Sequence, residues 1–170
     1  MTATPSEADN FRWHCAVAAM LIDTLPVTAA TSAHTRNAVR LATLTSVGKN
    51  GVLHASKQAK EIKESTGKKW HKCGLVQEHV IPLSLIHERV VEELKRSPAA
   101  SDQGGPSFPD NPRARLVARI VEDMTLLAWI SQDEDARLRD KSLQKCMPTD
   151  WDGQERFARY IACGIEYSTI

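Results

Sequence analysis

The sequence predicts a mainly α-helical protein, folded as a single domain in two lobes with one short β-hairpin at about residues 69–81. Three observations support this fold class. Apolar residues recur at helical spacing along most of the 170-residue chain, capping signals precede several of these stretches, and proline or glycine often follows them. The composition, 42% hydrophobic and 25% charged, is ordinary for one domain that buries a continuous core.

The first lobe, residues 1–97, is expected to contain four helices. The first begins at a capping box formed by Ser6 and Asp9 and continues to about Ile22, before Pro26. The other three are expected over residues 32–48, 55–66 and 84–97. Gly67 is suited to the position after the third helix, where the backbone often turns left-handed.

Residues 69–81 do not fit the helical pattern. Pro82 disfavours a helix that runs through this segment, and its β-branched residues favour an extended chain, so we expect a hairpin with its turn at residues 72–74. Side chains alternate between the two faces of a strand. Glu78 and His79 can therefore share a site only if the chain bends or bulges near Glu78.

A loop is expected over residues 98–111, because turn-forming residues occur throughout it. The second lobe, residues 112–170, should contain helices at 112–130, 131–145 and 149–165, the second of which starts at a capping box of Ser131 and Glu134. We expect both lobes to share one helical core, which a sheet of four or more strands would contradict. Its expected members are Ile22, Ile86, Leu94, Ile120, Leu127 and Ile161.

The net charge of +1 hides an uneven distribution along the chain. Residues 1–85 contain ten basic and six acidic side chains, whereas residues 86–170 contain twelve and fifteen. Six lysines lie within sixteen residues: Lys57, Lys60, Lys63, Lys68, Lys69 and Lys72. This basic segment predicts binding to a polyanion such as DNA or RNA, although the same pattern is also typical of a solvated helix face.

The run Glu78-His79-Val80-Ile81-Pro82 resembles the HNH, or ββα-metal, nucleases over about fifteen residues, 69–84. In that family the acid binds a divalent metal, the adjacent histidine activates water against a phosphodiester, and a later asparagine and histidine complete the site. The resemblance implies Glu78 as a metal ligand, His79 as the catalytic base, and Mg²⁺ or Mn²⁺ as cofactor. A neutral imidazole and a divalent cation suit this chemistry.

Other features of the sequence leave different functions open. The histidine and asparagine that follow His79 are His87 and Asn111, and neither lies at the spacing of an HNH site. Asp133, Glu134 and Asp135 could supply metal-binding oxygens if the second lobe folded back. Alternatively, Glu78 and His79 orient a turn, and the protein is a non-enzymatic inhibitor or regulator that binds a nucleoprotein or defence complex through its basic and acidic faces.

The remaining signals concern location and packing. The sequence has no apolar run of membrane-spanning length and no secretory pattern at its amino terminus, so we expect a cytoplasmic protein without a membrane partner. The four cysteines lie far apart and are expected to be free, buried thiols. Trp70, Trp129 and Trp151 occupy apolar or capping positions, where packing is the expected role.

Overall fold

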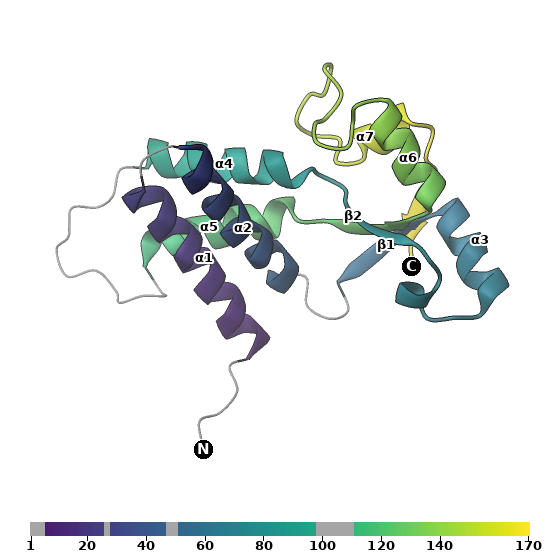
Figure 1. The fold of residues 1–170 in the computed structure, drawn as a ribbon, viewed down its shortest axis with the longest axis horizontal. Coiled ribbons are helices and arrows are strands. Elements are labelled where there is room, and N and C mark those ends of the chain that lie inside the picture. The colour runs from purple at the N-terminus through teal and green to yellow at the C-terminus, as the bar shows by residue number, and fades with distance from the viewer. Residues whose placement is uncertain (1–5, 26–27, 47–50, 98–110) are drawn as a thin grey trace. The chain divides into compact units, whose positions relative to one another are not determined.

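The computed structural model describes residues 6–25, 28–46, 51–97 and 111–170. The chain forms two compact units (Figure 1): unit 1 comprises residues 1–48 and 84–125, and unit 2 comprises residues 49–83 and 126–170. Helices dominate and the strands form one small sheet, which confirms the mainly α-helical class. Each unit combines two separate segments, whereas the lobes expected from the sequence were continuous. The single domain stays a prediction.

Unit 1 is helical. Its elements are α1 (Glu7–Thr24), α2 (Ala29–Ser46), α4 (Leu83–Arg96) and α5 (Pro112–Met124). The predicted capping box is present at α1, because Ser6 Oγ accepts from the Asp9 amide and the Asp9 carboxylate accepts from the Ser6 amide. α1 packs against α2 and α5. Its buried residues are mostly small, which permits close helix packing: Phe11, Cys15, Ala16, Ala18 and Ala19.

Unit 2 contains a four-stranded sheet with the order β2-β3-β1-β4. The strands are β1 (Val52–Ser56), β2 (Val76–His79), β3 (Leu127–Ile130) and β4 (Tyr167–Thr169). β1 is parallel to β3, whereas β2–β3 and β1–β4 are antiparallel pairs. The connecting elements are α3 (Lys57–Thr66), the 3-10 turn η1 (Trp70–Lys72), α6 (Gln132–Asp140) and α7 (Ala158–Ala162).

The core of unit 2 lies between the sheet and its helices. Residues of β3, α6 and α7, together with residues just outside β2 and α7, form one buried cluster, which contains Val80, Ala128, Ile130, Leu138, Phe157, Tyr160, Cys163 and Ile165. Phe157 also stacks on Tyr167 of β4, with ring centroids 3.7 Å apart and planes 7° from parallel. The aromatic contacts therefore fix the short edge strand β4 to the rest of the unit.

Four sequence predictions were wrong. Residues 69–81 do not form a hairpin, because residues 70–72 form η1 and β2 pairs with the distant β3. The helix expected over 112–130 ends at Met124, and residues 127–130 form β3. The helix expected over 149–165 is limited to α7, and its Ile161 is 58% exposed instead of buried. The expected helical core common to both lobes is not formed, because Leu127 and Ile161 belong to unit 2, which has a four-stranded sheet.

Other predictions agree better with the structure. The helix expected over 55–66 starts at Lys57, after β1, and Gly67 has the predicted left-handed backbone, with φ 63°. The capping box of Ser131 and Glu134 is present, although α6 ends at Asp140. Cys15 and Cys163 are buried, Cys73 is half-buried and Cys146 is exposed. Pro26 and almost all of the loop 98–111 lie outside the described residues.

Across the described ranges, each helix is too short or too polar to cross a membrane.

Candidate nucleic-acid interface

Glu78 and His79 lie on strand β2, whose pairing with β3 is regular. Successive residues of β2, from Val76 to His79, oppose successive residues of β3, from Ile130 back to Leu127. Because such a strand has no bulge at Glu78, the side chains of Glu78 and His79 project from opposite faces of the sheet. The bend required for a joint site is absent from this strand pair.

The Glu78 carboxylate accepts a hydrogen bond from Arg159 of α7, with Nη2 and Oε1 2.8 Å apart. Arg159 is fully buried, and its guanidinium also donates to the carbonyl oxygens of Val80 at 3.0 Å and Leu143 at 2.7 Å. Burial raises the pKa of Glu78, and the hydrogen bond and charge of Arg159 act against this rise. Glu78 is therefore part of a buried clamp that holds the end of β2.

Two of the three acidic residues in the first turn of α6, Glu134 and Asp135, have partners elsewhere in unit 2. Glu134 is buried and accepts from the Ser131 amide and from the Ser56 hydroxyl, and Asp135 pairs with Arg139 at 3.1 Å. Within the ranges that the structure describes, no group of three or more His, Cys, Asp or Glu side chains could hold a metal ion. Glu78 and His79 do not fit a shared metal site in this arrangement.

The later histidine and asparagine have local roles in unit 1. His87 Nε2 lies 2.9 Å from the hydroxyl of Thr35. Asn111 caps α5, because its side-chain oxygen accepts from the Ala114 amide at 2.6 Å. Both contacts explain these residues without reference to an HNH site.

The opposite face of β2 carries a different arrangement. Gln77 pairs with Trp129 and His79 pairs with Leu127, so these four side chains project from the same face of the sheet. Trp70 of η1 stacks on Trp129, with ring centroids 6.2 Å apart and planes 9° from parallel. Both tryptophans are only partly buried. They line a hollow of about 830 Å³.

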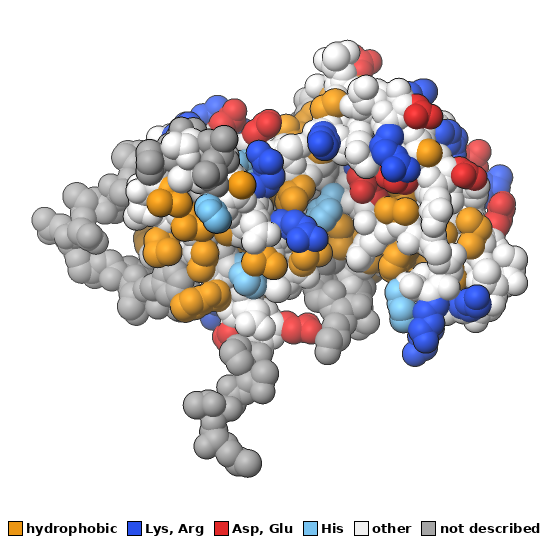
Figure 2. Space-filling view, in the orientation of Figure 1, with side chains coloured by type: hydrophobic (Ala, Val, Ile, Leu, Met, Phe, Trp, Pro, Cys, Tyr) orange, Lys and Arg blue, Asp and Glu red, His pale blue; other side chains and the backbone are white. Residues whose placement is uncertain are grey.

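Lysines surround this hollow. Lys63 of α3 and Lys68 and Lys69 of the following turn line it together with His71. Among the described side chains, Lys63, Lys68, Lys69 and the neighbouring Lys72 have no ion-pair partner. The left-handed backbone at Gly67 ends α3 and turns the chain toward η1. Figure 2 shows Lys and Arg side chains beside a histidine in the area where Figure 1 places η1.

The six lysines singled out in the sequence therefore form two groups. Lys57 pairs with Glu166 at 3.5 Å, in an exposed contact, and Lys60 donates to the Thr169 carbonyl at 2.7 Å. These two lysines lie beside β4. The other four, Lys63, Lys68, Lys69 and Lys72, lie at the hollow or next to it. Only the second group combines positive charge with exposed aromatic surface.

The tryptophan pair was missed by the sequence analysis, which assigned packing to both residues and placed Trp129 in a helix. The two residues are 59 positions apart, and no local pattern joins them. Comparison of the chain with protein-family models, with curated proteins and with solved structures finds no match.

Proposed function

We propose that unit 2 binds nucleic acid through the lysine-surrounded hollow that contains Trp70 and Trp129. The stacked tryptophan pair inside a basic hollow is the observation that carries this proposal. Proteins that bind single strands combine cationic side chains, which contact phosphates, with aromatic rings, on which bases stack. Unstacked bases are available in single-stranded DNA and RNA, so these are the expected ligands.

The residues of the hollow have suitable chemistry for this role. The partly exposed tryptophan rings offer base stacking, which contributes about 1–3 kcal/mol per base in such proteins. Lys68 and Lys69 can reach phosphates, and each phosphate contact releases counterions. Gln77, which projects from the same sheet face as Trp129, carries an amide that can donate to and accept from a base edge.

The first prediction compares two pairs of lysines in a binding assay. Replacing Lys68 and Lys69 with alanine should weaken binding of a fluorescent single-stranded oligonucleotide by about tenfold or more at low salt, since two phosphate contacts are lost. The matched control replaces Lys57 and Lys60, which already contact Glu166 and Thr169, and should change affinity little. Fluorescence anisotropy measures both affinities.

A third variant tests the aromatic contribution. Trp70→Ala in the short turn η1 should weaken binding without changing the number of phosphate contacts, and bound bases should quench tryptophan fluorescence in the wild type. Wild-type protein that binds no oligonucleotide at low salt would contradict the proposal. Equal losses in the two lysine double variants would do so as well. In either case the alternative of a non-enzymatic inhibitor or regulator would remain.

Metal-dependent cleavage, which the HNH resemblance implies, stays a prediction. His79 projects from the same face of the sheet as Trp129, so a nucleic acid in the hollow would lie on the side of the sheet that carries His79. If His79 is a catalytic base, His79→Ala should abolish Mg²⁺- or Mn²⁺-supported cleavage and leave oligonucleotide affinity nearly unchanged. Glu78→Gln, on the opposite face, should then affect stability more than cleavage. Equal cleavage by wild type and His79→Ala would exclude this role.

A further inference from the structure

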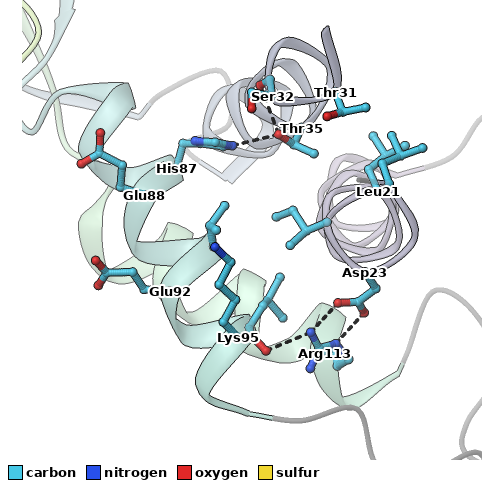
Figure 3. A pocket seen from close by; sticks show the side chains of 14 residues that line it. Leu21, Asp23, Thr31, Ser32, Thr35, His87, Glu88, Glu92, Lys95 and Arg113 are labelled. Carbon is cyan, nitrogen blue, oxygen red and sulfur yellow. Dashed lines mark hydrogen bonds and ion pairs between the residues drawn. The ribbon is translucent and has the colours of Figure 1, made fainter. Parts of the chain in front are cut away.

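Unit 1 contains a second site that the nucleic-acid proposal does not use. A pocket of about 520 Å³ lies between α1, α2 and α4, a size that suits a small organic ligand (Figure 3). Its apolar wall is formed by Leu21, Ile22, Leu25, Val91 and Leu94, and Thr31 is a polar neighbour in the lining. Polar and charged side chains of α1, α2, α4 and α5 complete the lining.

Most of the charged groups around this pocket are neutralised within the protein. Arg113 forms a bidentate ion pair with Asp23 and also donates to the carbonyl oxygens of Ser97 and Leu94. Its donors are therefore largely used. Glu92 pairs with Arg96 at 3.7 Å. In Figure 3 the carboxylates of Glu88 and Glu92 point away from the space that the helices enclose.

His87 and Thr35 supply a neutral polar wall. The Thr35 hydroxyl donates to the Ser32 carbonyl at 3.1 Å. Its oxygen is therefore the acceptor in the 2.9 Å contact with His87, and the hydrogen-bond network assigns the donated proton to His87 Nε2. Burial, aided by the charge of Arg36, lowers the pKa of His87. The imidazole is therefore uncharged at neutral pH and adds no cation to the pocket.

Lys95 is the remaining charged group of the lining that faces the pocket. Its ammonium has no ion-pair partner among the residues that the structure describes, and Figure 3 shows its side chain extending along α4 toward the enclosed space. An unneutralised cation beside an apolar wall favours a ligand with one negative charge and an apolar body. A cationic ligand would be repelled by Lys95, because the carboxylates of Glu88 and Glu92, which also line the pocket, point away from the enclosed space.

We propose that this pocket binds a small amphipathic carboxylate, whose charged group pairs with Lys95 and whose apolar part packs against Leu21, Ile22 and Val91. The Thr35–His87 wall can meet a polar group on the ligand. A charge-assisted hydrogen bond supplies orientation, and the apolar contacts supply most of the buried area.

The test compares three probes of equal chain length: octanoate, 1-octanol and octylammonium. Isothermal titration calorimetry on the full chain should show octanoate binding about tenfold more tightly than either other probe, since only octanoate pairs with Lys95. Lys95→Ala should remove this tenfold advantage and leave 1-octanol binding unchanged. Arg89→Ala, on the same helix, is the matched control and should retain it, because Arg89 and its partner Glu93 both lie outside the pocket lining.

A pocket-filling variant distinguishes binding in the pocket from binding to the exposed apolar residues of α1. Val91→Phe should weaken octanoate and 1-octanol together, because it occupies the space between the helices, whereas Met20→Ser, at an exposed position, should weaken neither. The proposal is overturned by equal affinity of the wild type for the three probes, by a tenfold octanoate advantage that survives Lys95→Ala, or by absence of octanoate binding. Since the pocket lies in unit 1, none of these results depends on nucleic-acid binding by unit 2.

Discussion

At the scale of single residues, Arg159 explains why the segment around Glu78 is unusual. The sequence singled out Glu78 and His79 for their chemistry, and one alternative held that they orient a turn. The structure gives Glu78 a buried partner, and Arg159 joins the end of β2 to the chain after α6 through the carbonyls of Val80 and Leu143. Sequence reasoning could not find this contact, because Arg159 lies 81 positions from Glu78.

Arg159→Leu should be strongly destabilising. It leaves the half-buried Glu78 carboxylate and several carbonyls without their donor, and breaking a buried pair from one side costs about 3–5 kcal/mol. Glu78→Gln should cost less, because the amide oxygen can still accept from Arg159. Urea unfolding measures both changes, with Arg156→Leu as an exposed control. A loss below about 1 kcal/mol for Arg159→Leu would be inconsistent with the clamp.

The half-buried imidazole of His87 should make unit 1 sensitive to acid. Its pKa is lowered in the folded state, so the unfolded chain binds more protons over the interval between the folded value and the ordinary value of 6.5. The stability contributed by the neutral ring is complete above pH 6.5 and is lost as the pH falls through this interval. His87→Gln should flatten the decrease in melting temperature between about pH 7 and pH 5. An unchanged decrease would contradict this assignment.

At the scale of elements, helix starts could be predicted and strands could not. The capping boxes at Ser6 and Ser131 are local patterns of four residues, and both are present. The strand Leu127–Ile130 is four residues long and almost wholly buried, so its apolar run shows no alternation and continues the helical pattern of α5. β4 has three residues and is defined by pairing with β1, which lies more than 100 positions away.

The hydroxyl of Ser56 illustrates how one cap can join several elements. It accepts from the Ala59 amide at the start of α3 and donates to the buried carboxylate of Glu134 in α6. Ser56→Ala should therefore cost more than the exposed cap variant Ser6→Ala, about 2–3 kcal/mol against about 1 kcal/mol, because it also removes one of the hydrogen bonds to the buried Glu134 carboxylate. Chemical denaturation of the two variants gives the comparison. Equal losses would show that the contact with Glu134 contributes nothing.

At the scale of the whole chain, the order of segments limits what the sequence could predict. Unit 1 is interrupted by residues 49–83, and unit 2 is interrupted by residues 84–125. A prediction from sequence places domain boundaries at loops such as 98–111. The first predicted lobe therefore contained both α3 and α4, although the two helices belong to different units. The lysine segment was recognisable because its members are close in sequence. The tryptophans that we propose as its partners in nucleic-acid binding come from opposite sides of the interruption.

The charge of the whole chain also bears on how the proposed nucleic-acid binding should depend on salt. The net charge of the chain is only +1, so attraction to a polyanion must come from a local group of cations. If Lys63, Lys68, Lys69 and Lys72 each contact one phosphate of a single strand, the logarithm of the affinity should fall with the logarithm of salt concentration with a slope of about −3, since each contact contributes about −0.7. Replacing Lys68 and Lys69 with alanine should reduce that slope by about 1.4. A wild-type slope steeper than about −5 would mean that cations outside the hollow take part, and an unchanged slope in the double variant would place the phosphates elsewhere on the protein.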